Sequence, residues 1–335
     1  MKKNTRIPVS IVIPMRNAST TVLETLKTVV KQKYPIKEII VVDNVSKDNS
    51  REIVSGFAKK TKIPLKLIKQ DKDRGISVSY NRGTKLARSP YVAFLMSDSS
   101  LPSENELEKL IEPLKNPEVV ASYSTSVLPG FVWNTYNFWE KYHAARMVDN
   151  KSSLMVLKFD CVKRDTFLKI GGFDEQNFGG DGAIGGEDAD ITARLQKMGK
   201  IVRSKADSLH LHYMASDYTL FNMMKSRKMY ARSYGRFLRK SAHENLKASL
   251  IFLVKPFLAI LPFIPGIYNI GLPIMFIYSF LYSKKMFITK STLFDPRIIL
   301  IPILNILLLY YETFWLLQAF LSFKQSNHSL AIRKT

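Results

Sequence analysis

Three carboxylates stand close together in the middle of the chain, after a pair of glycines and before a run of helical periodicity. They are Glu187, Asp188 and Asp190, and the helical run covers residues 191–198. The helix dipole favours a negative charge at the start of a helix, and a carboxylate there can accept a proton as a general base. We predict that Asp188 is this base and that Asp190 caps or hydrogen-bonds the helix. The alternative is a group of solvated charges at a helix start.

Two more aspartates, Asp43 and Asp98, each follow a short apolar run that is typical of a buried strand. These runs cover residues 38–42 and 91–96. Open parallel sheets bind their ligands beyond the carboxyl ends of the strands. The sequence therefore predicts a ligand site at one edge of a sheet, with Asp43 and Asp98 among its residues.

The segments around these aspartates alternate between strand and helix. Strand-like runs occur at 9–14, 38–42, 65–68 and 91–96, and helix-like runs at 20–33 and 77–88. This alternation predicts an α/β fold in which helices cover both faces of an open, mostly parallel sheet.

The chain has 335 residues, which is longer than one typical domain, and it has two unlike parts. Residues 1–245 mix charged and apolar residues as a globular domain does, whereas residues 246–323 are largely apolar and 324–335 form a polar tail. The mean hydropathy of -0.05 averages these parts. Cys161 is the only cysteine, which excludes disulfides within the chain and indicates a reducing environment.

Positive charge gathers directly before the apolar part. The net charge is +22, and nine basic residues lie between 225 and 255 against Glu244 alone. Apolar residues recur among these charges near 217–240, which predicts an amphipathic helix on an anionic membrane surface. Nucleic-acid binding is the alternative for so basic a chain, but neither zinc-finger spacing nor an aromatic RNA-binding motif accompanies the charge. We therefore expect a membrane partner and no nucleic acid.

The apolar part predicts two or three membrane segments. Segments 250–264 and 267–282 contain prolines and are shorter than the roughly 20 residues that cross a bilayer, whereas 298–323 is long enough to cross alone. The loop between them is basic, and the positive-inside tendency places such a loop in the cytosol. We predict a multi-pass protein of the cell membrane with its globular domain on the cytoplasmic face. The alternative for the two short segments is an interfacial or re-entrant pair.

Four sequence blocks, in their order along the chain, resemble the inverting family-two glycosyltransferases of GT-A fold. Together they extend over about residues 7 to 240, and four blocks in order are far more specific than one. The blocks are Val9–Asn17, Glu38–Asp48 with its Asp-x-x-Ser-x-Asp ending, Gly75–Asn81 followed by Tyr91–Asp98, and Gly171–Asp190 with its Gly-Gly-Phe-Asp-Glu start. The resemblance implies a nucleotide-diphospho-sugar transferase domain with a Rossmann-like mixed sheet.

The resemblance also implies a nucleotide pocket. Asp43 stands where the family contacts the nucleotide base, and a carboxylate can accept a hydrogen bond from a base N–H or a ribose hydroxyl. Arg16 either reaches phosphate or is a surface charge. The nucleotide-binding residues implied in this way are Pro14, Arg16, Asn17, Asp43, Ser46, Gly75, Asn81, Ser97 and Asp98.

The family uses a divalent cation, Mn or Mg, to neutralise the leaving diphosphate. Its Asp-x-Asp motif corresponds here to Met96-Ser97-Asp98, so the first carboxylate is missing. A hard cation that keeps water and phosphate oxygens as ligands tolerates a single protein carboxylate, and we expect metal use through Asp98. A further ligand in the family is often a histidine. His212 fits this role slightly better than His210, and a structural histidine is the alternative.

Asp188 also bears on the acceptor. A hydroxyl attacks the anomeric carbon well only if a base takes its proton, whereas a polyprenyl phosphate is already ionised. Family members that use such a phosphate lack the Glu-Asp pair. The resemblance therefore implies a nucleotide-sugar donor and a hydroxyl acceptor on a lipid-linked glycan or polysaccharide, bound by Glu187 and Arg164.

Two alternatives keep the same fold. A polyprenyl-phosphate glycosyltransferase would use the ionised phosphate as its acceptor. A non-catalytic, glycan-binding membrane scaffold would account for Met96 in the metal motif and for Tyr80, where the family usually has arginine.

Overall fold

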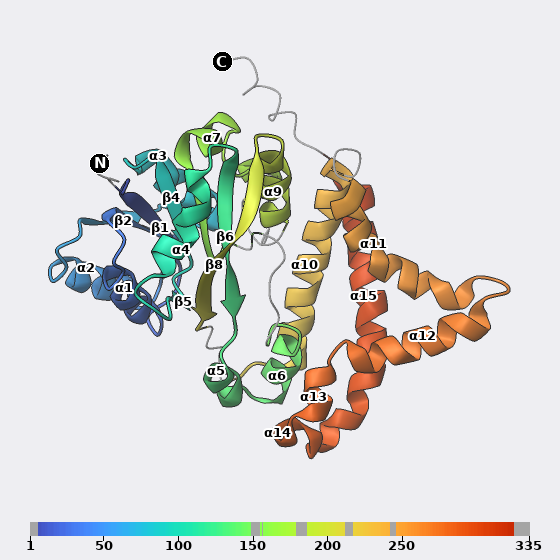
Figure 1. Ribbon diagram of the computed structural model, residues 1–335. Helices are drawn as coiled ribbons and strands as arrows, with labels where there is room; N and C mark the ends of the chain where they lie inside the picture. The colour runs from blue at the N-terminus through green and yellow to red at the C-terminus, as the bar shows by residue number, and fades with distance from the viewer. Residues whose placement is uncertain are drawn as a thin grey trace. The chain divides into compact units, whose positions relative to one another are not determined.

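The computed structural model describes residues 6–148, 155, 157–178, 186–211, 217–241 and 246–324 (Figure 1). These residues form two compact units. The first unit holds residues 6–129, 155, 157–178 and 186–211, and the second holds residues 130–148, 217–241 and 246–324. The sequence predicts one boundary near residue 245. In the structure, the basic helix and residues 130–148, a segment rich in aromatic side chains, belong instead to the unit of the apolar helices.

The first unit is built on one mixed sheet of eight strands in the order β3-β2-β1-β4-β7-β6-β8-β5. β1 pairs in parallel with β2 and β4, whereas β7 runs antiparallel to both β4 and β6. The strands are β1 (Val9–Met15), β2 (Ile36–Asp43), β3 (Leu65–Lys69), β4 (Tyr91–Leu95), β5 (Ser99–Ser100), β6 (Val119–Val127), β7 (Phe159–Lys163) and β8 (Lys200–His210). The predicted α/β architecture with a mixed sheet is confirmed.

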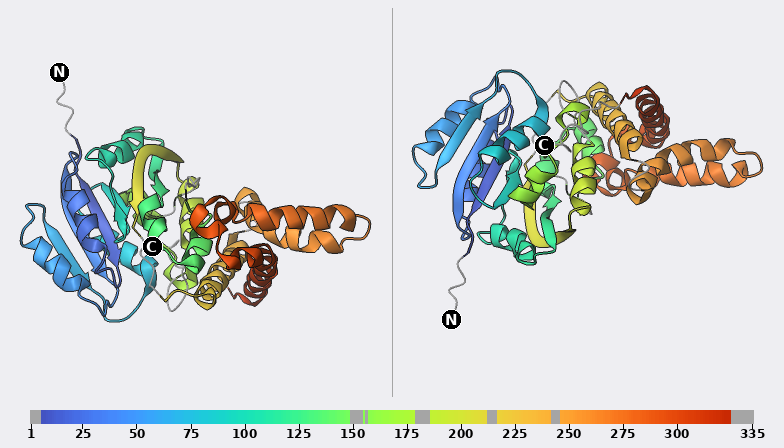
Figure 2. Two further views of the ribbon diagram at one scale, coloured as in Figure 1. Left: turned by 90° about the horizontal axis from the view of Figure 1, so that it is seen from below. Right: turned by 90° about the horizontal axis from the view of Figure 1, so that it is seen from above.

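Helices cover both faces of this sheet, as Figure 2 shows from two sides. α1, α2 and α4 bury apolar side chains against one face, and α3, α7 and α9 bury theirs against the other. Each face therefore has its own apolar core. The helices of this unit are α1 (Val22–Val30), α2 (Ser50–Ala58), α3 (Gly75–Leu86), α4 (Glu106–Ile111), η1 (Glu112–Lys115), α7 (Arg164–Lys169), α8 (Glu175–Phe178) and α9 (Glu187–Gln196).

The central strands and their helices follow from the apolar pattern. All seven residues of β1 are buried, which explains why its sequence is almost continuously apolar instead of alternating. α1 is amphipathic, since Val22, Leu26 and Val29 recur at helical spacing and are fully buried. This two-sided packing fixes where the strands end.

The carboxyl ends of the parallel strands lie side by side. Met15 ends β1 opposite Asp43, which ends β2. The Asn44 N–H, directly after β2, donates to the Met15 carbonyl at 2.8 Å. β4 pairs with the other side of β1 and ends at Leu95, shortly before Asp98. The aspartates predicted for the ligand site therefore lie at the carboxyl ends of the two strands that flank β1, with Asp43 ending β2 and Asp98 shortly after β4.

The second unit is helical. Its elements are α5 (Gly130–Thr135), α6 (Phe138–Ala144), α10 (Leu220–Ser241), α11 (Leu246–Ile260), η2 (Leu261–Phe263), α12 (Tyr268–Leu281), α13 (Lys284–Ile288), α14 (Lys290–Leu293), η3 (Pro296–Leu300) and α15 (Ile301–Ser322). Among the described residues, one helical stretch, Pro296–Ser322, is long and apolar enough to cross a membrane. The apolar helices before it are shorter, as the sequence predicts.

Charged side chains are buried between the helices of the second unit. Arg227 of α10 and Glu312 of α15 are both buried and lie 3.6 Å apart. Lys255 of α11 also pairs with Glu312. A buried charge is costly unless it is paired, so these contacts tie the three helices together. The basic helix thus buries part of its charge within the helical unit.

Close packing of α3 on β1 can be tested with one added methyl group. A Cβ atom on Gly83 would overlap Cγ1 of Val12. We predict that Gly83→Ala destabilises the protein by about 1–3 kcal/mol, because overpacking forces side chains and backbone to shift. Unfolding followed by circular dichroism measures the change.

Gly56→Ala is the matched control. Gly56 lies in α2, and nothing is within 4 Å of a Cβ atom built there. This variant should be neutral or stabilise the helix by up to about 1 kcal/mol. Equal stabilities of the two variants would contradict the packing of α3 on β1.

Candidate active site

Asp43 offers a hydrogen-bond acceptor at the end of β2. Its side chain is 1% exposed and Oδ1 accepts from the Ser46 N–H at 3.2 Å. Oδ2 has no hydrogen-bond partner among the described residues, although the Arg51 guanidinium lies 3.8 Å away. Buried polar atoms are rarely left without a partner. Oδ2 is therefore suited to accept from an N–H or hydroxyl group of a ligand.

The loop after β1 is locked to the loop after β2. Asn17 has a left-handed backbone with φ 49°. Its N–H donates to Ser46 Oγ at 3.0 Å, and its Oδ1 accepts from the Lys47 N–H at 2.8 Å. Pro14 is buried near the end of β1. The structure thus brings Pro14, Asn17 and Ser46 to the edge where Asp43 lies.

Arg16 belongs to a polar network with the loop before α3. It pairs with Asp73, whose Oδ1 accepts from Asn44 Nδ2 at 2.6 Å and from the Gly75 N–H at 3.1 Å. Gly75 has φ 78°, a conformation that favours glycine. The Arg16 side chain is 52% exposed. A phosphate contact by Arg16 would therefore compete with the Asp73 ion pair.

Asn81 and Arg164 have structural partners. Asn81 Oδ1 accepts from the Phe173 N–H at 2.8 Å, and its Nδ2 donates to the Phe173 carbonyl at 2.9 Å and to Glu175 Oε1 at 2.7 Å. Arg164 donates to two carbonyls in the last turn of α3, each at 3.2 Å. These bonds fix a loop and a helix end. The roles predicted for both residues in ligand binding stay predictions.

Asp98 is the first member of a chain of three side chains. Its Oδ2 lies 3.1 Å from His210 Nε2, and His210 Nδ1 lies 3.2 Å from Lys158 Nζ. The His210 side chain is 12% exposed and that of Asp98 is 21% exposed. Burial lowers the pKa of Lys158, and the charge of Asp98 opposes that shift. Three segments that are distant in sequence thus meet at the end of β4. Ser97, next to Asp98, accepts from Thr25 through its carbonyl at 2.9 Å.

Leu157 lies in a strained turn, and two side chains hold its backbone by hydrogen bonds. Its φ is 59°, a left-handed conformation that costs leucine free energy. The Tyr80 hydroxyl donates to its carbonyl, and its N–H donates to Asp160 Oδ2, each at 2.7 Å. Burial, then the charges of Asp160, Asp98 and Glu187, raise the pKa of Tyr80. The raised pKa keeps the Tyr80 hydroxyl protonated, as a donor to Leu157 must be.

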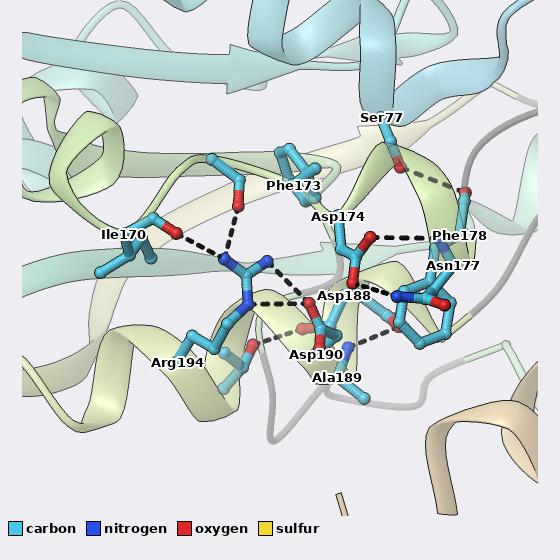
Figure 3. A network of polar contacts seen from close by, with 12 residues as sticks. Ser77, Ile170, Phe173, Asp174, Asn177, Phe178, Asp188, Ala189, Asp190 and Arg194 are labelled. Carbon is cyan, nitrogen blue, oxygen red and sulfur yellow. Dashed lines mark hydrogen bonds and ion pairs between the residues drawn. The ribbon is translucent and has the colours of Figure 1, made fainter. Parts of the chain in front are cut away.

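Asp188 lies in the first turn of α9, after Gly186 with φ 87°. Its Oδ1 accepts from the Ala189 N–H at 2.8 Å (Figure 3). Burial raises the pKa of the Asp188 carboxyl, and backbone hydrogen bonds offset part of that shift. A carboxylate with a raised pKa is a stronger base. Asp188 is thus suited to accept a proton.

Asp190 holds Arg194, which bonds α9 to the turn after α7. Its Oδ2 accepts from Arg194 Nε at 2.9 Å and Nη2 at 2.6 Å. Arg194 Nη1 donates to the carbonyls of Ile170 at 3.0 Å and Gly172 at 2.6 Å (Figure 3). Asp190 is thus a hydrogen-bonding carboxylate, one of the roles predicted for it, and it holds the helix start that carries Asp188.

One family model matches the chain. The glycosyl transferase family 2 model matches residues 10–170, which are just under half of the chain. This part of the chain is similar to the family 2 glycosyltransferases. Poly-beta-1,6-N-acetyl-D-glucosamine synthase of Staphylococcus epidermidis is 32% identical over 113 residues, which are 34% of this chain and 27% of that protein. Dolichol-phosphate mannosyltransferase of Pyrococcus furiosus is 30% identical over 167 residues, which are 49% of this chain and 45% of that protein. The matched part is thus less than half the length of either relative.

The fold of the chain is GT-A, as predicted. A solved mannosyltransferase from Pyrobaculum calidifontis, in complex with GDP-Man and Mn2+, has a TM-score of 0.61 to it. The match covers 93% of this chain and 88% of that one at 16% identity. At this identity the likeness concerns the fold alone.

A divalent cation would find few protein ligands among the residues that the structure describes. The described residues contain no group of three or more His, Cys, Asp or Glu side chains that could enclose a metal ion. Asp98 and His210 fit a cation that takes its other ligands from diphosphate and water, and they do not form a cage. His212, the preferred histidine in the sequence prediction, lies outside the described residues.

Sequence reasoning missed Lys158 and Asp160, and it noted Tyr80 only as a departure from the family. Lys158 and Asp160 come at the start of β7, and the antiparallel pairing of β7 with β4 leaves no trace in the local pattern. The available signal in the sequence was the pair of charged residues, Lys158 and Asp160, on either side of the apolar Phe159 at the start of the strand.

Removal of the Tyr80 hydroxyl tests the turn at Leu157. Tyr80→Phe leaves a buried carbonyl without its donor, and we predict a loss of about 1–2 kcal/mol in the free energy of unfolding. Tyr91→Phe is the control, since that hydroxyl lies 3.5 Å from the Leu114 carbonyl and contributes little. Denaturant unfolding measures both variants. Equal stabilities would contradict the role of the hydroxyl.

Proposed function

We propose that the chain is an inverting glycosyltransferase that moves a sugar from a nucleotide-sugar donor to a hydroxyl of a lipid-linked glycan or polysaccharide. The observation that carries this proposal is Asp188, a carboxylate in the first turn of α9 whose pKa is raised by burial. The match of residues 10–170 to glycosyl transferase family 2 supports the reaction class. The likeness to a polysaccharide synthase supports a glycan acceptor.

The proposed donor pocket is the carboxyl edge of β1, β2 and β4. Asp43 Oδ2 would accept a hydrogen bond from the nucleotide base or ribose, which would complete its hydrogen bonding. The loop that Asn17 and Ser46 lock together would line the nucleoside side of the pocket. Asp98, after β4, would lie at the diphosphate.

Asp188 would act as the general base. Its carboxylate would take the proton of the acceptor hydroxyl while that oxygen forms a bond to the anomeric carbon. The bond from this carbon to the diphosphate would break on the opposite face, so the anomeric configuration is inverted. A positioned base of this kind contributes about 10²–10⁴ in rate. Glu187, buried beside it in α9, is proposed to bind the acceptor.

A divalent cation, Mn or Mg, is proposed as the cofactor. When bound it would neutralise the charge that develops on the departing diphosphate. Asp98 would hold it together with His210 or His212. Because Met96 supplies no second carboxylate, the cation should bind only weakly without nucleotide.

The apolar helices are proposed to attach the enzyme to the cell membrane as a multi-pass protein with its catalytic unit on the cytoplasmic face. The helical stretch Pro296–Ser322 has the length to cross a bilayer. Basic residues of α10 suit the anionic lipids of the cytoplasmic leaflet. A lipid-linked acceptor agrees with this attachment.

A polyprenyl phosphate is the second candidate acceptor, favoured by the likeness to dolichol-phosphate mannosyltransferase. Its phosphate is ionised at neutral pH and needs no base. The two candidates therefore differ in whether Asp188 is required, which one variant can decide.

Asp188→Asn removes the proposed base while keeping the size of the side chain. We predict that kcat falls about 10²–10⁴-fold, because the acceptor hydroxyl keeps its proton, while nucleotide affinity is unchanged. The assay uses whichever UDP-, GDP- or dTDP-sugar raises the melting temperature of the protein most. Asp207→Asn, on an exposed part of β8, is the control and should keep full activity. Near-normal transfer by Asp188→Asn would reject Asp188 as base and favour the phosphate acceptor.

The pH dependence of transfer gives a separate test. Only the ionised carboxylate accepts a proton, so kcat/KM should fall as the pH drops through the pKa of Asp188. Since burial raises that pKa, the acid limb should lie above the ordinary aspartate value of 3.8. The residual activity of Asp188→Asn should lack this limb. An identical limb in the variant would assign it to another group.

A further inference from the structure

Met96 and Lys158 stand opposite each other where β4 and β7 meet. Leu95 pairs with Phe159 in the antiparallel register, and the Met96 N–H donates to the Lys158 carbonyl at 3.1 Å. Residues directly opposite in antiparallel strands place their side chains on the same face. Met96 is also the position at which the expected carboxylate is missing. A lysine is therefore found directly across from the lost acid.

The ammonium group of Lys158 lies 3.2 Å from His210 Nδ1, and His210 links it to Asp98. A lysine ammonium can only donate, so His210 accepts at Nδ1 and presents Nε2–H to Asp98 Oδ2. His210 thereby links a fixed cation to the carboxylate proposed to face the diphosphate. Both ring nitrogens of His210 are hydrogen-bonded in this arrangement, so a cation at Nε2 would have to replace the bond to Asp98.

The backbone before Lys158 is held in place. The left-handed Leu157 is fixed by the Tyr80 hydroxyl on its carbonyl and by Asp160 on its N–H. A strained backbone persists only where the surrounding structure determines it, and such positions gather at functional sites. The turn thus places Lys158 where its ammonium group contacts His210.

The charges at this end of β4 differ from those of a two-carboxylate metal motif. Two carboxylates need a divalent cation before a diphosphate can approach, because like charges repel. In this chain one carboxylate is replaced by methionine and an ammonium is added, so Asp98 and Lys158 cancel. A diphosphate at this site therefore needs less positive charge from a bound cation than it would at a two-carboxylate motif.

We propose that Lys158 is a binding residue for the diphosphate of the donor and gives the site affinity for a nucleoside diphosphate without a divalent cation. This inference rests on the proposed function. Lys158 would donate to a diphosphate oxygen, and a bound cation would add to its effect instead of being a requirement.

Calorimetric titration of the full chain with UDP, GDP and dTDP, each in EDTA and in MnCl2, tests the proposal. The wild type should bind one of them in both buffers. Lys158→Met should weaken binding in EDTA about tenfold or more, because a charge-assisted hydrogen bond is lost, and by less than about threefold in MnCl2. Lys158→Arg keeps the charge and should retain binding in EDTA. Met96→Asp should make binding depend more strongly on Mn2+.

Lys169→Met is the matched control, since Lys169 is an exposed lysine of α7. Circular dichroism melting of each variant shows whether it is folded. Binding by the wild type in MnCl2 but not in EDTA would overturn the role of Lys158 and leave the proposed function standing. Equal losses for Lys158→Met in both buffers, or no loss relative to Lys169→Met, would overturn it as well. Failure of all three nucleotides in both buffers would contradict the proposed function itself.

Discussion

The buried ring of Tyr80 is the contact on which the arrangement of the site depends. Its hydroxyl holds the turn at Leu157, and its ring packs against Phe94 of β4 at 4.7 Å and against Phe173 at 5.5 Å between centroids. β4 leads to Asp98, and the Phe173 segment is bonded to α9 through Arg194. One side chain thus links the segments that carry the proposed diphosphate and base groups. Arginine at this position, as in the resembling family, could not be buried in this way without a partner for its charge.

Burial of charged groups is the second constraint, and the four buried or partly buried carboxylates of the site differ in how fully their hydrogen bonds are satisfied. Asp190 and Asp98 have partners that fix them, as Arg194 and His210 show. Asp43 keeps one oxygen without a hydrogen bond, and the pKa of Asp188 is raised by burial. Asp190 holds the structure and Asp98 is positioned by His210, whereas Asp43 and Asp188 have interactions that a ligand would complete. The same low-dielectric surroundings make each of these groups sensitive to the charge that a ligand brings.

Much of the fold follows from local patterns, and the parts that do not are long-range pairings. Runs of buried β-branched residues predict β1, β2 and β4 together with Asp43 and Asp98 at their ends, because side-chain periodicity is a local property. The helix start at Asp188 is visible from its glycine and acidic residues. The pairing of β7 with β4, and with it the place of Lys158, depends on residues that are far apart in the sequence. The grouping of α10 with the apolar helices likewise depends on the buried Arg227–Glu312 pair, which a basic amphipathic pattern does not indicate.

In the proposed transfer reaction, the acceptor and the leaving group lie on opposite faces of the sugar. The anomeric configuration of the product tests this most directly. Transfer from an α-linked nucleotide sugar, followed by nuclear magnetic resonance of the product, should show a β-linkage at the new bond. An α-linked product would contradict single-step inversion with Asp188 as the base.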